Sequence, residues 1–170
     1  MTTINGKALV NDSKPLDRVY SNGQLVYGRN YILDTANPKT QTSNGNNNQD
    51  LYDEAKFFKS LDQWGKSDIK YIISFDWKLK DSLANDMNLL VIFNQSPWQN
   101  FTTIIPANKL NGHVEIIVSL WDTMISAKPT SLTFRINSQM VSGNTITYSN
   151  LFMKSGTITT DWTPAPEDYI

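Results

Sequence analysis

The sequence contains no cysteine and only one histidine, His113. The absence of cysteine excludes disulfide bonds, thiolate metal sites and cysteine nucleophiles. A single histidine excludes metal sites built from several imidazoles and leaves one candidate for a Ser–His pair. Because His113 directly follows Asn111-Gly112, a turn signal, we expect it to be a solvated turn residue rather than a catalytic base.

Positive charge is also scarce, with three arginines and a formal net charge of −1 from 15 basic and 16 acidic residues. Proteins that bind nucleic acid through phosphate contacts are normally more basic, so we expect no nucleic-acid partner. The uncharged apolar runs are only a few residues long, so we expect no membrane insertion. The polar stretch after Met1 lacks the apolar core of a secretory signal.

Amide and hydroxyl side chains are abundant. Asn, Gln, Ser and Thr account for 56 of the 170 residues, whereas charged residues make up 18% and aromatic residues 11%, with five tryptophans. This composition suits a surface that recognises neutral polar ligands, yet β-rich proteins in general favour Thr, Asn and aromatic residues. Composition alone leaves both interpretations open.

The chain is expected to consist of an N-terminal arm, 1–29, and a main domain, 30–170. In the arm, Asn22-Gly23 lies between two short β-prone runs, 18–20 and 25–27. This pattern predicts a β-hairpin, because a type I′ turn needs positive φ at both central positions. A lone hairpin is marginally stable in water. The arm should therefore pack on the main domain, pair with another chain or be disordered.

The main domain alternates like a β protein from residue 52 onward. In the clearest strand, 71–80, one face carries the apolar side chains Tyr71, Ile73, Phe75, Trp77 and Leu79. About eight such segments with turn signals between them predict an all-β fold, an antiparallel two-sheet β-sandwich of the jelly-roll type. Residues 35–50 are predicted to form a long polar loop, and 51–64 fit either a strand or a short helix.

Several segments resemble a known family when they are taken in order along the chain. They are Asn30-Tyr31-Ile32-Leu33, residues 71–78, Asn94-Gln95-Ser96-Pro97-Trp98, residues 132–136, and 146–168 with its closing Asp161-Trp162-Thr163-Pro164-Ala165-Pro166-Glu167-Asp168. Together these segments resemble the jelly-roll carbohydrate-binding modules in tail and baseplate proteins of siphophages that infect lactic acid bacteria. The closing run is fairly specific to such chains, whereas the strand patterns alone are not.

This resemblance implies a non-catalytic adhesion module of the virion, made in the host cytoplasm and carried at the phage tail tip or baseplate. Its implied partners are bacterial cell-wall polysaccharide and other phage tail proteins. The alternative is a structural baseplate spacer, which should expose an apolar patch instead of an amide-rich groove. No cofactor is implied, although such modules often carry one structural calcium ion, for which we assign no ligands.

The family topology implies that one of the two sheets is concave. The strands that it places there are Lys56–Leu61, Leu132–Asn137, Leu89–Gln95 and Phe101–Ile105. The side chains that would point outward from this sheet are Ile92, Asn94, Thr103, Thr133, Arg135 and Asn137.

The loop from Asn94 to Asn100 has the chemistry of a saccharide site. Sugars present hydroxyl groups in fixed directions and apolar C–H faces, so a site needs planar amides and an aromatic platform. Trp98 would stack on a pyranose face, unless it folds back as a lid on the sandwich edge. Pro97 limits the freedom of the loop, which lowers the entropy lost on binding. The amides that would bind hydroxyls are Asn94, Gln95 and Gln99.

Three more residues complete the predicted binding site: Arg135, Asn137 and Trp121. Arg135 could donate two parallel hydrogen bonds to a ligand, or it could instead form a cross-strand ion pair. Trp121, at the end of a strand, is either a second platform or a side chain packed beneath a loop. If the ligand binds at the loop rim, Trp98 and Trp121 matter and Arg135 does not.

The carboxylates give little support to a glycosidase. Hydrolysis needs two carboxylates that flank the bond, and the chain has only three glutamates, Glu54, Glu115 and Glu167. Asp76 and Glu115 could approach each other across a sheet, but nothing marks either of them as buried. We therefore predict no enzyme activity and no catalytic residues. Acidic residues with EF-hand spacing are absent, so no metal ligands are predicted.

Overall fold

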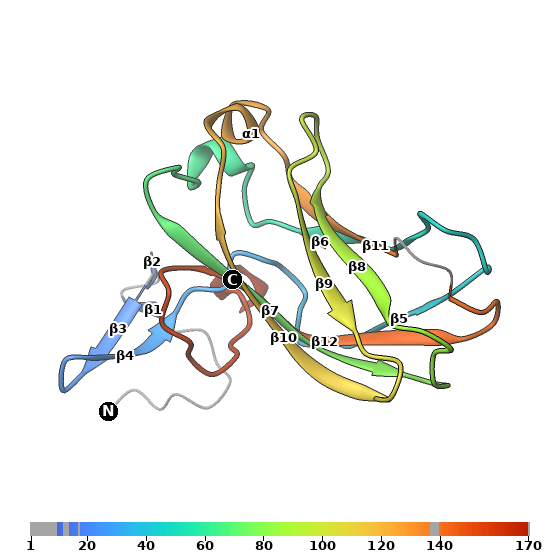
Figure 1. Cartoon of the computed structure of the whole chain (residues 1–170). Coiled ribbons are helices and arrows are strands. Elements are labelled where there is room, and N and C mark those ends of the chain that lie inside the picture. The colour runs from blue at the N-terminus through green and yellow to red at the C-terminus, as the bar shows by residue number, and fades with distance from the viewer. Residues whose placement is uncertain (1–9, 12–13, 17, 137–139, 170) are drawn as a thin grey trace.

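Two four-stranded antiparallel sheets form a sandwich in the computed structural model, which describes residues 10–11, 14–16, 18–136 and 140–169. The sheet that we name the back sheet has the order β10 (Asn111–Ser119), β7 (Lys70–Leu79), β12 (Thr145–Ser155) and β5 (Lys39–Thr42). The groove sheet has the order β6 (Asp50–Lys56), β11 (Ser131–Ile136), β8 (Met87–Phe93) and β9 (Asn100–Ile105). Figure 1 shows the sheets as two layers, so the predicted all-β sandwich is confirmed.

The core lies between the layers and follows from the alternation of each strand. In β7, the predicted apolar face is buried, and Phe75 meets Phe134 of the groove sheet edge-on with ring centroids 5.1 Å apart. In β8, the inward side chains Leu89, Val91 and Phe93 are fully buried. The outer face of the same strand carries Leu90 and Ile92, which gives the groove sheet an apolar strip on its outer surface.

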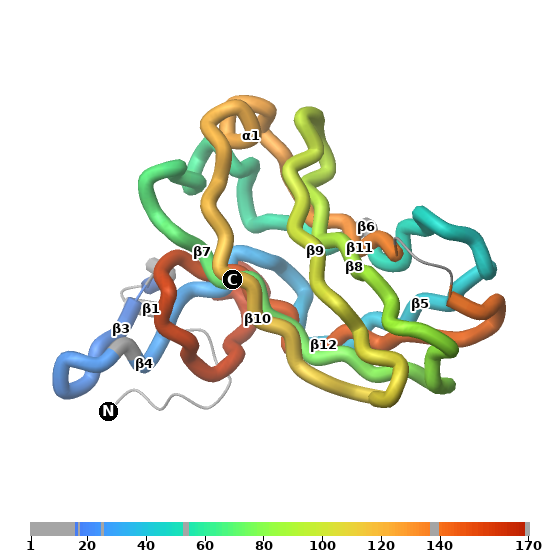
Figure 2. The backbone as a smooth tube through the Cα atoms, viewed as in Figure 1, coloured from blue at the N-terminus to red at the C-terminus, as the bar shows by residue number. Residues whose placement is uncertain are grey.

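The remaining elements are short. They are β1 (Val10–Asn11), β2 (Lys14–Pro15), β3 (Arg18–Ser21), β4 (Gln24–Gly28), η1 (Leu61–Gln63), α1 (Asp122–Ser126) and η2 (Pro166–Tyr169). In the described parts of the chain, no helix is long and apolar enough to cross a bilayer. Figure 2 shows the path of the backbone through these elements, with α1 beside the turn that joins β8 to β9.

The predicted hairpin is present as β3 and β4, with Asn22 and Gly23 at φ of 50° and 78° in its turn. Tyr27 of β4 is buried, and a Cβ at Gly28 would lie only 2.7 Å from Cδ of Lys154 in β12. The described part of the arm therefore packs against the back sheet, which is one of the three outcomes expected for it. This contact offsets the marginal stability that an isolated two-stranded hairpin has in water.

The C-terminal run fastens the chain to the back sheet. Nε1 of Trp162 donates a hydrogen bond to the carbonyl of Leu151 in β12 at 3.2 Å. Nδ2 of Asn30 donates to the carbonyls of Leu151 and Thr163 at 2.9 and 3.1 Å. The backbone carbonyls of β12 and of the C-terminal run thus meet at the one buried amide of Asn30.

Two local predictions need correction. The segment 35–50 is not one long loop, because β5 forms there and pairs with the start of β12, Thr42 opposite Thr145. The ambiguous segment 51–64 contains both β6 and the short helix η1, so the sheet strand ends at Lys56 and does not run from Lys56 to Leu61. Both errors involve polar or mixed edge strands, in which apolar alternation is weak.

Candidate functional site

The outer face of the groove sheet holds an open cavity of about 660 Å³, which we call the groove. Strands β6, β11 and β8, the loop after β8 and the first residue of β9 supply its walls. The lining residues are Asp50, Leu90, Ile92, Phe93, Asn94, Trp98, Asn100, Ser131, Thr133 and Arg135. The predicted concave sheet and the predicted loop therefore meet in one cavity.

The floor of the groove is apolar, because the even-numbered side chains of β8 point outward. Ile92 lies opposite Thr133 of β11, and Leu90 lies opposite Arg135. Ile92 is buried although it faces outward, so the neighbouring side chains cover most of its surface. A strip of aliphatic side chains bordered by hydroxyl and guanidinium groups can receive the C–H face of a polar ring.

Trp98 forms the end wall of the groove, with 56% of its surface exposed. Its backbone N–H donates to the carbonyl of Gln95 at 2.8 Å, and its φ is 55°, a value that bulky residues seldom adopt. The indole is thus held in solvent, and the alternative of a lid folded onto the sandwich does not describe this structure. An exposed indole next to an aliphatic floor is suited to stacking.

An ion pair between Arg135 and Asp50 supplies the charged groups of the groove. Nε of Arg135 donates to Oδ1 at 2.6 Å and Nη2 donates to Oδ2 at 3.0 Å, and each side chain is 40% exposed. The hydrogen bonds to Asp50 raise the pKa of Arg135. The fork engages two of the five N–H donors of a guanidinium and fixes its plane. The cross-strand ion pair considered for Arg135 is therefore present, and it lies inside the groove.

Asn94 lines the groove, but its amide also holds the start of β11. Its Oδ1 accepts hydrogen bonds from the N–H groups of Thr130 at 3.0 Å and Ser131 at 3.3 Å. Its Nδ2 donates to Oγ1 of Thr130 at 3.2 Å. Gln95, the next predicted contact, is exposed but does not line the groove.

Gln99 is buried and serves the structure. Its Nε2 donates to the carbonyl of Ser119 at 2.6 Å, and its Oε1 accepts the backbone N–H of Trp121 at 3.0 Å. Both ends of the amide are engaged, so the expected contact of Gln99 with a saccharide hydroxyl is revised to a link between the loop and β10. Trp121 is 51% exposed and does not line the groove. Asn137 lies outside the described residues.

The register of β9 corrects one residue that was predicted to face outward, Thr103, and adds one lining residue, Asn100. Thr103 pairs with Leu89, whose side chain is in the core, so Thr103 points inward and the prediction for it is wrong. Asn100 pairs with Ile92 instead and lines the groove. Asp50 was missed because the family resemblance placed the first strand of this sheet at Lys56–Leu61, whereas β6 begins at Asp50. Its position directly before the apolar pair at 51–52 was the available signal.

The carboxylates considered for hydrolysis lie on the other sheet. Asp76 accepts a hydrogen bond from Asn150 at 2.6 Å and lies 2.7 Å from Nδ1 of the exposed His113. Glu115 accepts a hydrogen bond from Thr159 at 2.8 Å. Within the described ranges, no three His, Asp or Glu side chains are grouped so that they could hold a metal ion.

No protein-family model matches the sequence, and no curated protein matches it. Among solved structures, the tripod from the baseplate of bacteriophage Tuc2009 is similar at 15% identity and a TM-score of 0.54, over 82% of this chain and 59% of that chain. A carbohydrate-binding module specific for non-crystalline cellulose shows 14% identity and a TM-score of 0.43, over 87% and 86% of the two chains. The chain thus spans less than two thirds of the tripod chain and shares its fold, as the sequence resemblance predicted.

Proposed function

We propose that this protein is a non-catalytic module of a phage tail or baseplate that binds polysaccharide of the bacterial cell wall. The observation that carries the proposal is the groove, in which an exposed indole, an aliphatic floor and a fixed ion pair face one open cavity. The baseplate fold supports the location in the virion. The cell-wall polysaccharide follows from the resemblance of the sequence to phage carbohydrate-binding modules.

Each part of the groove has a role in this proposal. Trp98 stacks on the apolar face of one pyranose ring, and Leu90 and Ile92 lie beneath the next. Hydroxyl groups of the saccharide bond to the amide of Asn100 and to the Arg135–Asp50 pair, which offers donors and acceptors side by side. Because Arg135 is already oriented by Asp50, binding costs little ordering of that side chain.

The groove is suited to weak binding of a neutral polar chain. Its shallow hydroxyl contacts barely exceed the cost of association, so a single site should have a dissociation constant between about 10 μM and 1 mM. Several copies of the module on one virion would raise the effective affinity through avidity. Strong attachment would then depend on copy number rather than on one deep pocket.

Binding is favoured over hydrolysis because the described lining of the groove lacks a pair of carboxylates. Glycosidases use two carboxyl groups that flank the scissile bond. Among the described lining residues, Asp50 is the one carboxylate, and both of its oxygens accept hydrogen bonds from Arg135. A carboxylate held in this way is a poor nucleophile or general acid.

Contact with other tail proteins belongs to the same proposal. Ile104 on the edge strand β9 and Ile117 on the edge strand β10 are both more than half exposed. Exposed apolar side chains on sheet edges are suited to packing against neighbouring proteins. As the sole function, a spacer fits less well, because it does not explain the groove.

The test is the labelling of intact lactic acid bacteria by a fluorescent fusion of the whole chain. Strain-selective labelling is expected, and Trp98→Ala should reduce it about tenfold, because the variant removes the stacking platform. Trp121→Ala is the matched control, since it removes an equally exposed indole outside the groove. No labelling of any strain, even by clustered fusions, would favour the spacer. Loss of labelling with both Trp98→Ala and Trp121→Ala would move the site from the groove to the loop rim.

A further inference from the structure

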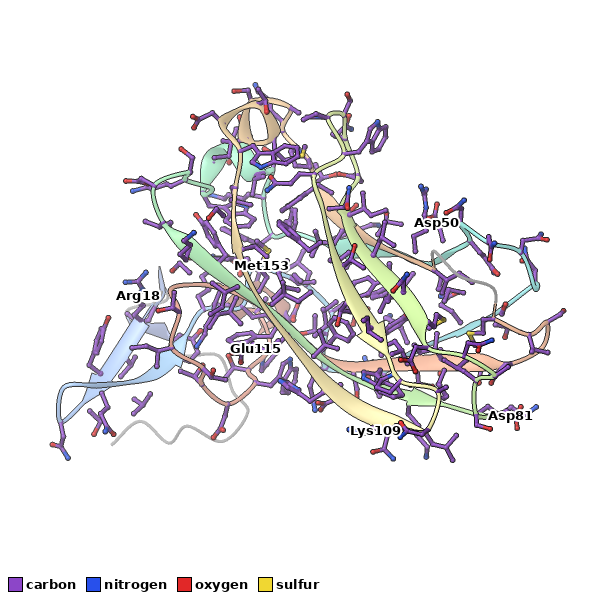
Figure 3. All side chains as sticks on the ribbon, viewed as in Figure 1. Arg18, Asp50, Asp81, Lys109, Glu115 and Met153 are labelled. Atoms are coloured by element: carbon purple, nitrogen blue, oxygen red, sulfur yellow. The ribbon has the colours of Figure 1, made fainter. Side chains whose placement is uncertain are left out.

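A second cavity, of about 620 Å³, lies between the arm and the segment that joins β6 to β7. We call it the basic pocket, because four cations line it: Arg18, Arg29, Lys59 and Lys66. Figure 3 shows Arg18 of this pocket and Asp50 of the groove far apart on the molecule. The two cavities are therefore separate sites.

The basic pocket and the groove differ in charge. Among the described lining residues, those of the groove include one cation, Arg135, and one carboxylate, Asp50, whereas those of the basic pocket include no acidic residue. Glu167 forms an ion pair with Arg29 from outside the lining, so it offsets part of this charge. An excess of positive charge remains, in a chain whose net charge is −1. Concentrated positive charge in a cavity attracts anions.

Aromatic rings form one wall of the basic pocket, and one of these rings packs against the guanidinium of Arg29. The rings of Tyr31 and Trp64 stack with centroids 4.4 Å apart, and the guanidinium of Arg29 lies 4.1 Å from the centroid of Phe58. Arg18 is positioned by a hydrogen bond from its Nη2 to Oγ of Ser155 at 2.8 Å. The wall is thus pre-ordered, while Lys59 and Lys66 are exposed at its margin.

We propose that the basic pocket binds an anionic sugar unit, one that carries a phosphate or carboxylate group. The planar guanidinium of Arg18 matches either anion with two parallel donors, and the lysines add point charges. Partly exposed Phe58 and Trp64 offer apolar faces for the attached ring. A polynucleotide fits less well, because it needs a basic track longer than one cavity.

The experiment is an NMR titration of the ¹⁵N-labelled whole chain with glucose 1-phosphate, glucuronic acid, glucose and inorganic phosphate. Glucose 1-phosphate or glucuronic acid should shift the indole N–H of Trp64 and the amides near Lys59 and Lys66, with saturation in the millimolar range. Neutral glucose should not shift them. Raising the ionic strength from about 0.05 to about 0.3 M should weaken binding.

Variants that remove positive charge test whether anionic sugars bind in the basic pocket. The double variant Lys59→Gln, Lys66→Gln should weaken binding about fivefold, whereas the matched double variant Lys78→Gln, Lys109→Gln should change it less than about twofold. Both pairs are exposed, so folding is not at risk. Equal losses in the two pairs, or the absence of saturable binding of either anionic sugar, would overturn the proposal. Inorganic phosphate binding as tightly as glucose 1-phosphate would overturn the assignment of a sugar.

These outcomes are independent of the proposed function. Trp98→Ala should leave anion binding unchanged, because Trp98 lines the groove and does not line the basic pocket. Cell labelling tests the groove, and the titration tests the basic pocket. Either can fail while the other holds.

Discussion

Lys154 offers a direct test of how the arm, the back sheet and the tail pack together. Its side chain is 1% exposed, and Nζ donates to Oγ1 of Thr160 at 2.9 Å. Burial lowers its pKa from 10.5 to about 8, an effect that Glu115 opposes and Arg18 reinforces. At neutral pH the protein therefore holds a buried, largely protonated amine.

The sign and size of the effect follow from proton linkage. Between about pH 8 and pH 10.5 the unfolded chain binds more protons at Lys154 than the native chain, so the free energy of unfolding rises with pH across this window. The full shift corresponds to about 3 kcal/mol, of which about 2 kcal/mol falls between about pH 7 and pH 9.5. Below about pH 7 Lys154 is protonated in both states, so the native state carries the whole free-energy cost of burying its charge.

Lys154→Met removes this cost and keeps an unbranched side chain beside Gly28. At pH 7 the variant should be more stable by about 1–2 kcal/mol, after about 1 kcal/mol is subtracted for the lost bond to Thr160 and a similar or smaller amount for the contact with Phe152. At pH 9.5 the advantage should disappear or reverse.

Urea denaturation of both proteins at the two pH values measures this difference. The other titrating groups are common to both proteins, so they cancel when the unfolding free energies are subtracted. The exposed Lys109→Met is the control and should show no pH-dependent difference. A gap between wild type and Lys154→Met that stays constant from pH 7 to pH 9.5 would refute the reasoning, because the buried charge would then have no cost.

Two further predictions concern the core and the groove. Gly112→Ala should lower the free energy of unfolding by about 1–3 kcal/mol, because its Cβ would lie 2.8 Å from Cζ2 of the buried Trp77; thermal unfolding measures this, and an unchanged melting temperature would contradict it. Asp50→Asn should cost no more than about 1 kcal/mol in denaturant unfolding, because the pair with Arg135 is partly exposed. The same variant should weaken saccharide binding, and unchanged binding would remove the ion pair from the site.

Strong local signals in the sequence predicted much of the fold. The alternation in β7 identified its buried face, and Asn22-Gly23 identified the hairpin turn, because both depend on neighbours along the chain. The strand β5 was missed, since its residues are polar and pair with β12 more than one hundred positions away. Edge strands of this kind are set by tertiary pairing rather than by local pattern.

The candidate site was predictable as a region but not residue by residue. The loop that carries Trp98 and the strand that carries Arg135 do meet in one groove. The sequence does not predict which side chains of β9 face the core. Thr102 and Thr103 are chemically alike, and an alternating pattern is visible only when neighbouring residues differ in polarity. The burial of Gln99 depends on the backbone groups of Ser119 and Trp121, which lie about twenty positions further along the chain.

The buried amide of Gln99 also has a mechanical consequence. Trp98 belongs to a loop of the groove sheet, whereas Ser119, which accepts the hydrogen bond of Gln99, ends a strand of the back sheet. Under the proposed function, a virion held by this protein would pull on the saccharide that Trp98 contacts. Force applied at the indole of Trp98 would pass through the amide of Gln99 into the back sheet. The loop that carries Trp98 would therefore not detach from the protein unless the sandwich as a whole unfolded.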